Sequence, residues 1–135
     1  DRLADAYALR AAARLEQGAD AEAFDDLGRA IRASRSPLPH LMNRADLARR
    51  MGRVEEEIAD LTAALELSPL SNDLRIYRAW ALARHSRIFS RSGPRDRAAD
   101  LLRRAEEDLK LVRPHTLLPT VSAAVAEARA ALGKP

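Results

Sequence analysis

Apolar positions along the chain recur at the three- to four-residue spacing of amphipathic helices, and short segments with Gly or Pro separate these runs. Gly18, Gly52 and Gly93 each interrupt a run, and prolines bias the residues before them away from helix. The pattern therefore predicts an all-α protein. The expected helices cover about residues 2–17, 20–33, 39–51, 54–67, 73–90, 94–112 and 120–132.

Polar residues at the start of two of these segments are candidate helix caps. Asp20 is expected to cap the second helix, and Ser71 or Asn72 the fifth. The last helix should bury one face. The residues expected on that face are Val121, Ala124, Val125, Ala128 and Leu132.

A stretch of about thirty residues occurs twice with a period of 34. The recurring pairs are Arg10 and Arg44, Ala11 and Ala45, Gly18 and Gly52, Glu22 and Glu56, Asp26 and Asp60, Leu27 and Leu61, Ala30 and Ala64, and Ser34 and Ser68. A period of roughly 20 to 50 residues is typical of solenoids, in which each unit buries its apolar face against its neighbours. Such arrays usually bind partners, so the repeat predicts a binding scaffold.

A third unit begins in register and then becomes longer. Arg78 and Ala79 continue the period of 34, but the spacing from Gly52 to Gly93 exceeds this period by seven positions. Seven residues have been added within about residues 85–91, which is close to two helical turns and keeps a buried face in phase. A longer fifth helix is therefore expected.

The second unit resembles a tetratricopeptide repeat, in which two antiparallel helices form a unit of about 34 residues. The residues on or beside the consensus places of that family are Leu41, Ala45, Gly52, Ile58, Leu61, Ala64 and Pro69. Glu57 departs from the pattern, because the family prefers Ala there. The resemblance implies a right-handed superhelix in which residues 1–135 form one array, with units at about 4–37, 38–71 and 72–114. A C-terminal helix at about 118–132 is then either a cap or the first helix of a truncated fourth unit.

The resemblance also implies a concave groove lined mainly by the first helix of each unit. Trp80, the only Trp, and Tyr77 are suitable anchors for a peptide or a partner helix. The alternative is that Trp80 packs against its own long helix or against the last one. The predicted groove residues are Asn43, Asp46, Arg49, Arg50, Ile76, Tyr77, Trp80 and Arg84.

The net charge of +3 is unevenly distributed, because residues 74–104 hold nine Arg and only two acidic residues. Arg84, Arg87 and Arg91 are spaced as a stripe on one helix face, which suits phosphate or an acidic partner. A solvated face is the alternative. Of the aromatic residues that could stack on bases, only Phe89 is close, which disfavours nucleic-acid binding.

Few residues suggest chemistry. Cysteine is absent, and His40, His85 and His115 are isolated from one another and expected at the surface or in caps. No phosphate loop and no nucleophile motif occurs, so we expect no catalytic residue, no metal and no cofactor. No apolar run is long enough for a membrane span. The chain starts at Asp1 without Met, which suggests part of a longer or processed protein.

Together these patterns predict a non-catalytic scaffold that binds a protein or peptide partner in its concave groove. The alternative is a spacer segment of a longer bacterial array, for example in polysaccharide export or secretion. A third hypothesis is an accessory module of an enzyme, docked through the arginine stripe. The compartment stays open between cytoplasm and, for an exported bacterial scaffold, periplasm.

Overall fold

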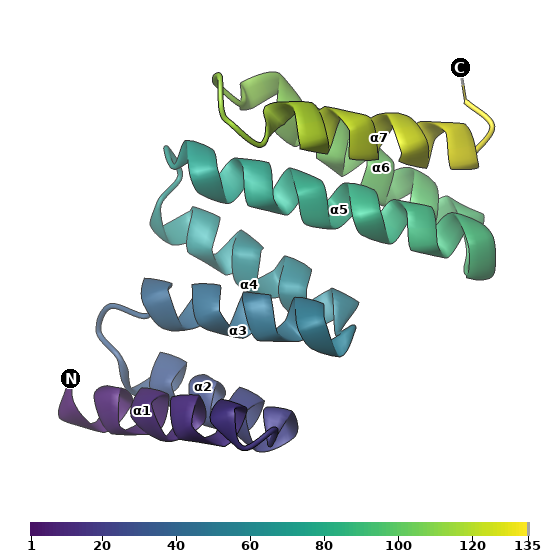
Figure 1. Cartoon of the computed structure of the whole chain (residues 1–135). Coiled ribbons are helices and arrows are strands. Elements are labelled where there is room, and N and C mark those ends of the chain that lie inside the picture. Colours follow the sequence, from purple (N-terminus) through teal and green to yellow (C-terminus); the bar gives the residue numbers. More distant parts are fainter. Residues whose placement is uncertain (135) are drawn as a thin grey trace. The chain divides into compact units, whose positions relative to one another are not determined.

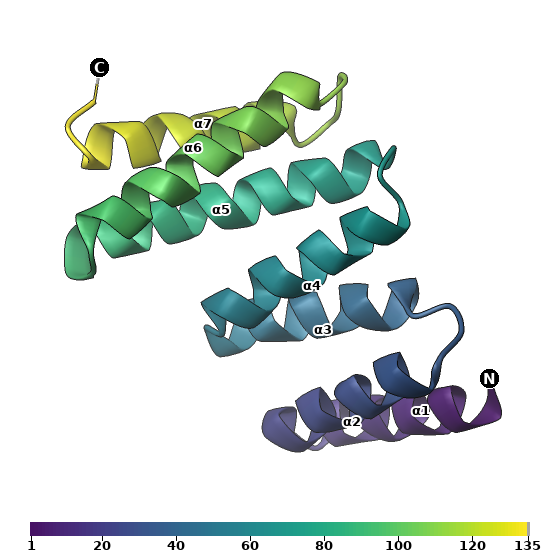
Figure 2. The same cartoon turned by 180° about the vertical axis from the view of Figure 1, so that it is seen from behind.

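The computed structural model describes residues 1–134, and within them the chain forms seven α-helices and no β-strand. Figures 1 and 2 show the first six as sequential antiparallel hairpins, followed by the last helix. The helices are α1 (Arg2–Glu16), α2 (Asp20–Ala33), α3 (Leu38–Met51), α4 (Val54–Leu67), α5 (Asn72–Ser92), α6 (Arg95–Leu111) and α7 (Leu118–Ala131). The expected all-α class is confirmed, and the helix bounds agree with the sequence pattern to within two residues.

Glycine ends the first helix of two hairpins for a conformational reason. Gly18 and Gly52 adopt the left-handed φ values of 74° and 71°, which cost a residue with a Cβ atom considerably more. The backbone N–H groups of Ala19 and Arg53, which follow these glycines, return to helix carbonyls at 2.8 Å. This arrangement satisfies carbonyls that the helix end would otherwise leave unpaired.

One of the predicted caps is present and one is wrong. The Ser71 hydroxyl accepts a hydrogen bond from the Leu74 N–H at 3.2 Å at the start of α5, as expected. Asp20 is instead the first residue of α2, and Ala19 occupies the cap position without a side-chain bond. Asp20 therefore places negative charge in the first turn, where it interacts favourably with the helix dipole.

The chain divides into two compact units, Asp1–Leu67 and the residues from Ser68 onward. In the first, α1 pairs with α2 and α3 with α4, and α2 packs against α3. Small residues permit this close packing, since Ala11 and Ala45 are buried and leave no side chain to separate the helices. The core where the two hairpins meet contains Ala11, Ala23, Phe24, Leu27, Leu47 and Ala48. A continuous array over residues 1–135 stays a prediction.

In the second unit, α5 pairs with α6, and α7 packs mainly against α5 and also touches α6. Ile76 and Ala79 of α5 meet Val121 of α7 in a fully buried cluster. Of the face expected for the last helix, Val121, Val125, Ala128 and Leu132 are buried and Ala124 is half-buried. Polar links also join these helices, because Arg87 pairs with Glu127 and Arg129 with Glu106.

Each hairpin is also held by the same ion pair between its two helices. Arg10 donates to the Asp26 carboxylate through Nε at 2.8 Å and Nη2 at 2.6 Å. Arg44 donates to Asp60, and Arg78 to Asp108, through the same two nitrogens at 2.8 and 2.7 Å. The side chains of the three aspartates are at most 6% exposed. A parallel pair of bonds of this kind fixes both the distance and the orientation of the helices that it joins.

The turn glycine is the midpoint of every pair. Arg10 and Asp26 each lie eight residues from Gly18, and the second hairpin repeats this spacing around Gly52. In the third hairpin, Arg78 and Asp108 each lie fifteen residues from Gly93. The predicted seven-residue extension of the fifth helix is thus matched by an aspartate that lies seven residues further from the turn, although α6 is only three residues longer than α2 and α4. Both displacements are needed, because the two helices run in opposite directions from the turn.

Asp60→Asn is predicted to destabilise the first unit by about 2–3 kcal/mol, because it leaves the half-buried Arg44 guanidinium without its charged partner. Urea unfolding followed by circular dichroism measures the change. Asp46→Asn is the matched control, since Asp46 pairs with Arg49 at the exposed surface of the neighbouring helix. An equal loss in both variants would contradict a structural role for the buried pair.

Acid should unfold the first unit partly through Asp26. Hydrogen bonds from Arg10 lower the pKa of this carboxyl from 3.8 to about 2, with further contributions from Arg29 and Arg14. A lowered folded-state pKa contributes stability above pH of about 4, and this contribution is lost as the pH falls towards 2. Asp26→Asn should therefore flatten the stability profile between those pH values, whereas Asp25→Asn at the exposed neighbouring residue should not. The measurement is urea unfolding at constant ionic strength over a pH series.

Candidate functional site

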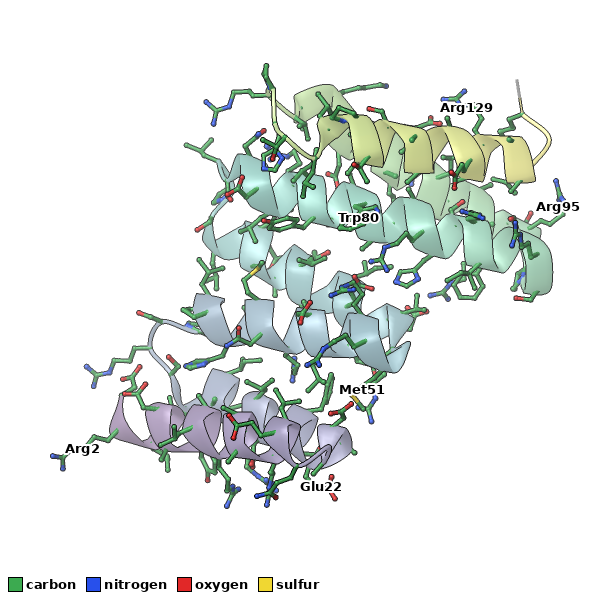
Figure 3. All side chains as sticks on the ribbon, in the orientation of Figure 1. Arg2, Glu22, Met51, Trp80, Arg95 and Arg129 are labelled. Atoms are coloured by element: carbon green, nitrogen blue, oxygen red, sulfur yellow. The ribbon has the colours of Figure 1, made fainter. Side chains whose placement is uncertain are left out.

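The aromatic residues predicted to anchor a partner lie on α5 in the second unit. Trp80 stands midway along the helix (Figure 3) and, like Tyr77, is half-buried against the cluster formed with α7. The Arg84 guanidinium carbon lies 5.3 Å from the centre of the Trp80 ring. The indole is thus partly packed in the core and partly accessible to solvent. Its position is compatible with both predicted roles of Trp80, packing against neighbouring helices and contact with a partner.

Ile76 differs from the other predicted groove residues of α5. It is completely buried in the cluster with Ala79 and Val121. Helical spacing placed it beside Tyr77 and Trp80, but α7 covers this position. Ile76 therefore belongs to the core of its unit and offers no surface to a partner.

The predicted groove residues of α3 lie in the first unit and are all exposed. Asp46 pairs with Arg49 at 2.6 Å and with Arg50 at 3.5 Å, and Asn43 lies one turn earlier on the same helix. These pairs are solvated and contribute little to stability. They form a polar face with one carboxylate, two guanidinium groups and an amide.

The predicted basic stripe on α5 is divided among different contacts. Arg87 forms an ion pair with Glu127 of α7, and Arg84 covers the Trp80 ring. Arg91 is exposed near the end of the helix. Other arginines of the basic segment bind within the unit, for example Arg95 to the Leu132 carbonyl at 2.8 Å. Much of the local excess of positive charge thus serves contacts inside the second unit.

One of the three histidines departs from the expected surface or cap position. His115 Nε2 lies 2.8 Å from Asp73, and its Nδ1 accepts the Leu117 N–H at 3.0 Å, which connects the segment before α7 to the start of α5. His85 is only 4% exposed, so its prediction as a surface or cap residue is wrong. It lies in the segment by which α5 is lengthened, beside Ser86. The Ser86 hydroxyl donates to the Ala98 carbonyl at 2.6 Å.

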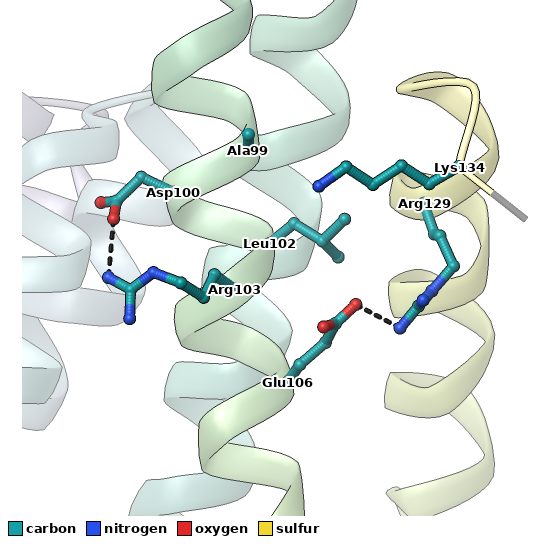
Figure 4. A pocket seen from close by; sticks show the side chains of 7 residues that line it. All are labelled: Ala99, Asp100, Leu102, Arg103, Glu106, Arg129 and Lys134. Carbon is teal, nitrogen blue, oxygen red and sulfur yellow. Dashed lines mark hydrogen bonds and ion pairs between the residues drawn. The ribbon is translucent and has the colours of Figure 1, made fainter.

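A cavity of about 360 Å³ opens between α6 and α7, at a place that the sequence did not indicate (Figure 4). Asp100 pairs with Arg103, and Glu106 pairs with Arg129. The Lys134 side chain extends towards α6 above Leu102. The lining therefore carries one more positive than negative charge, and Lys134 is the lining charge outside these two pairs. The lining residues are Ala99, Asp100, Leu102, Arg103, Glu106, Arg129 and Lys134.

Within residues 1–134, no group of three or more His, Cys, Asp or Glu side chains is arranged to hold a metal ion. None of the helices in that range combines the length and apolar character that crossing a membrane requires. Comparison with protein-family models, with curated proteins and with solved structures finds no match for the chain. The findings therefore support a protein of packed helical hairpins, and the tetratricopeptide resemblance depends on the sequence pattern alone.

The burial of Ile76 leads to a test on one helix. Ile76→Ala should destabilise the second unit by about 2–5 kcal/mol, because it opens a cavity between α5 and α7. Ile88→Ala makes the same change on α5 at a side chain that is half exposed, and should cost less than about 1 kcal/mol. Urea unfolding monitored by the fluorescence of Trp80 reports both values. Similar losses of stability in the two variants would show that α7 does not cover Ile76.

Proposed function

We propose that this protein is a non-catalytic helical-hairpin scaffold that binds a protein or peptide partner, with Trp80, Tyr77 and Arg84 as the anchor. The observation that carries the proposal is the half-buried indole, held on one side by the α5–α7 cluster and covered by a guanidinium group. A side chain already fixed by packing loses little conformational entropy when a partner binds. Trp, Tyr and Arg are also the residues most enriched at the energetic centres of interfaces.

The charge of the second unit favours an acidic partner with an apolar side chain. Residues 74–104 carry nine Arg and two acidic residues, a balance that attracts acidic segments and speeds their encounter. The apolar side chain would contact the indole, and a carboxylate would lie near Arg84. The exposed α3 face is proposed as a further contact surface of the first unit, through Asn43 and its ion-paired neighbours.

The proposal includes the way in which the helical hairpins are arranged as repeats. The period of the repeat and the matches to the tetratricopeptide pattern support a right-handed superhelix with a concave groove. The burial of Ala11, Ala45 and Ala79 agrees with that pattern, which places small residues where helices cross closely. The repeated Arg–Asp pair supports three units built to one plan.

The alternative function, a spacer within a longer array, is favoured by the way α7 ends. Gly133 has a φ of 70°, and the Lys134 N–H donates to the Arg129 carbonyl at 3.0 Å. The same bond joins Ala19 to Arg14 at the end of α1. Helix α7 therefore ends as α1 and α3 do, with a left-handed glycine. A spacer would need no partner on α5.

Selection from a displayed library of random peptides tests the anchor. Peptides with acidic and apolar residues should be enriched by the wild-type protein, and Trp80→Ala combined with Tyr77→Ala should weaken their binding at least about tenfold, the usual effect of losing a binding hot spot. Phe89→Ala is the control, because Phe89 is another half-buried aromatic residue on α5 with an arginine over its ring. Fluorescence anisotropy of labelled peptides measures the affinities.

Circular dichroism should show unchanged helicity in these variants. Failure to enrich any peptide, or equal binding by the double variant and the wild type, would contradict the anchor. The first of these outcomes is the one that the spacer alternative expects.

A further inference from the structure

Gly28 lies in the middle of α2, where glycine is an unfavourable residue. Its backbone is helical and buried, so no turn or left-handed conformation requires it. A helix-interior glycine is destabilising relative to alanine. The repeat does not require it either, because Thr62 stands at the corresponding position one period later. The missing side chain must therefore be explained by the surroundings of this position.

Two guanidinium groups converge on the space that a side chain would occupy. A Cβ atom at position 28 would lie 3.2 Å from Arg44 Nη1 and 3.5 Å from Arg32 Nη1. Both nitrogens thus approach one point above the helix. Arg44 is already paired with a carboxylate, so the second guanidinium group leaves one positive charge at this point uncompensated.

Arg44 is positioned by the pair that holds the second hairpin. Its Nε and Nη2 donate to Asp60, which leaves Nη1 directed towards Gly28. Its guanidinium carbon also lies 5.3 Å from the centre of the Phe24 ring, and that of Arg53 lies 4.4 Å from the same ring. The group is therefore oriented before any ligand arrives.

The second guanidinium group is that of Arg32, and its charge is unpaired within the described residues. Its side chain makes no hydrogen bond or ion pair among residues 1–134. One period later the chain has Glu66, so the repeat does not impose a basic residue here. Arg32 and Arg44 come from α2 and α3, and therefore meet only because the two hairpins pack together.

A cavity of about 220 Å³ surrounds this point. Arg29 also lines it and is bonded to the buried Asp26 at 2.9 Å. Asp25 is the one carboxylate among the described lining residues. The lining residues are Phe24, Asp25, Gly28, Arg29, Arg32 and Arg44.

We propose that this cradle, the cavity above Gly28 between Arg32 and Arg44, binds a phosphate-type oxyanion, either free or as a phosphate ester. Guanidinium groups present planar N–H donors that match the oxygens of phosphate. Without a Cβ atom at position 28, one of those oxygens would lie over the Gly28 Cα atom, between the two guanidinium groups. Phosphate binding would compensate the charge of Arg32 and offset the unfavourable glycine.

Titration calorimetry with inorganic phosphate tests the site, with chloride at equal ionic strength as the reference, because non-specific charge attraction is screened by salt. Saturable binding is expected for the wild type. Arg32→Gln should weaken it at least about tenfold, since a charge-assisted contact is lost. Gly28→Ala should also weaken it, although alanine favours the helix, because the added methyl group would crowd an oxyanion lying over this position.

Arg35→Gln is the matched control, since it removes an exposed arginine just after α2 and should leave phosphate binding unchanged. Trp80→Ala should also leave it unchanged, which separates this site from the proposed partner anchor. Tighter binding of glycerol 3-phosphate than of phosphate would support the ester as ligand, and equal binding would support the free anion. Absence of saturable binding, or wild-type affinity in Arg32→Gln, would overturn the proposal.

Discussion

The fold depends on a carboxylate buried between two helices and held by an arginine of the facing helix. Taking such a charge out of water is costly unless its hydrogen bonds are fully replaced. Asp26 meets this condition with four bonds from three arginines, and Asp60 and Asp108 with two parallel bonds each. The strict geometry of these bonds means that a hairpin with its helices out of register would lose them. The pair therefore specifies register, while the alanines and leucines around it supply most of the burial.

Much of this architecture was readable from the chain because helix ends are marked locally. Gly18 and Gly52 are needed at left-handed positions, and Ser71 can satisfy a free N–H of α5 by itself. Such signals act within a few residues and need no knowledge of the tertiary fold. The cap assigned to Asp20 failed because a residue suited to a cap also suits the first helical turn.

The sequence indicated the residues of the ion pairs only in part. Arg10, Arg44 and Arg78 keep the period, and Asp26 and Asp60 keep it too, but Asp108 is displaced by the longer hairpin. The shared period of an arginine and an aspartate does not show that their side chains are in contact. Ile76 and His85 were misplaced for a related reason, because helical spacing defines faces but does not say which neighbouring element covers them. The convergence of Arg32 and Arg44 above Gly28 required the packing of α2 on α3, which no local pattern contains.

The equal distances of arginine and aspartate from the turn have a consequence for how such chains change length during evolution. A heptad inserted into one helix alone would move its charge two turns away from its counterpart and leave the carboxylate buried without a cation. Lengthening of one helix must therefore be accompanied by a shift of the acid along the other, in two stretches of the gene that are separated from each other. In the third hairpin the acid lies seven residues further from the turn, on a helix only three residues longer than α2 and α4. Hairpins of this kind should consequently change length in steps that keep the arginine and the acid equally distant from the turn.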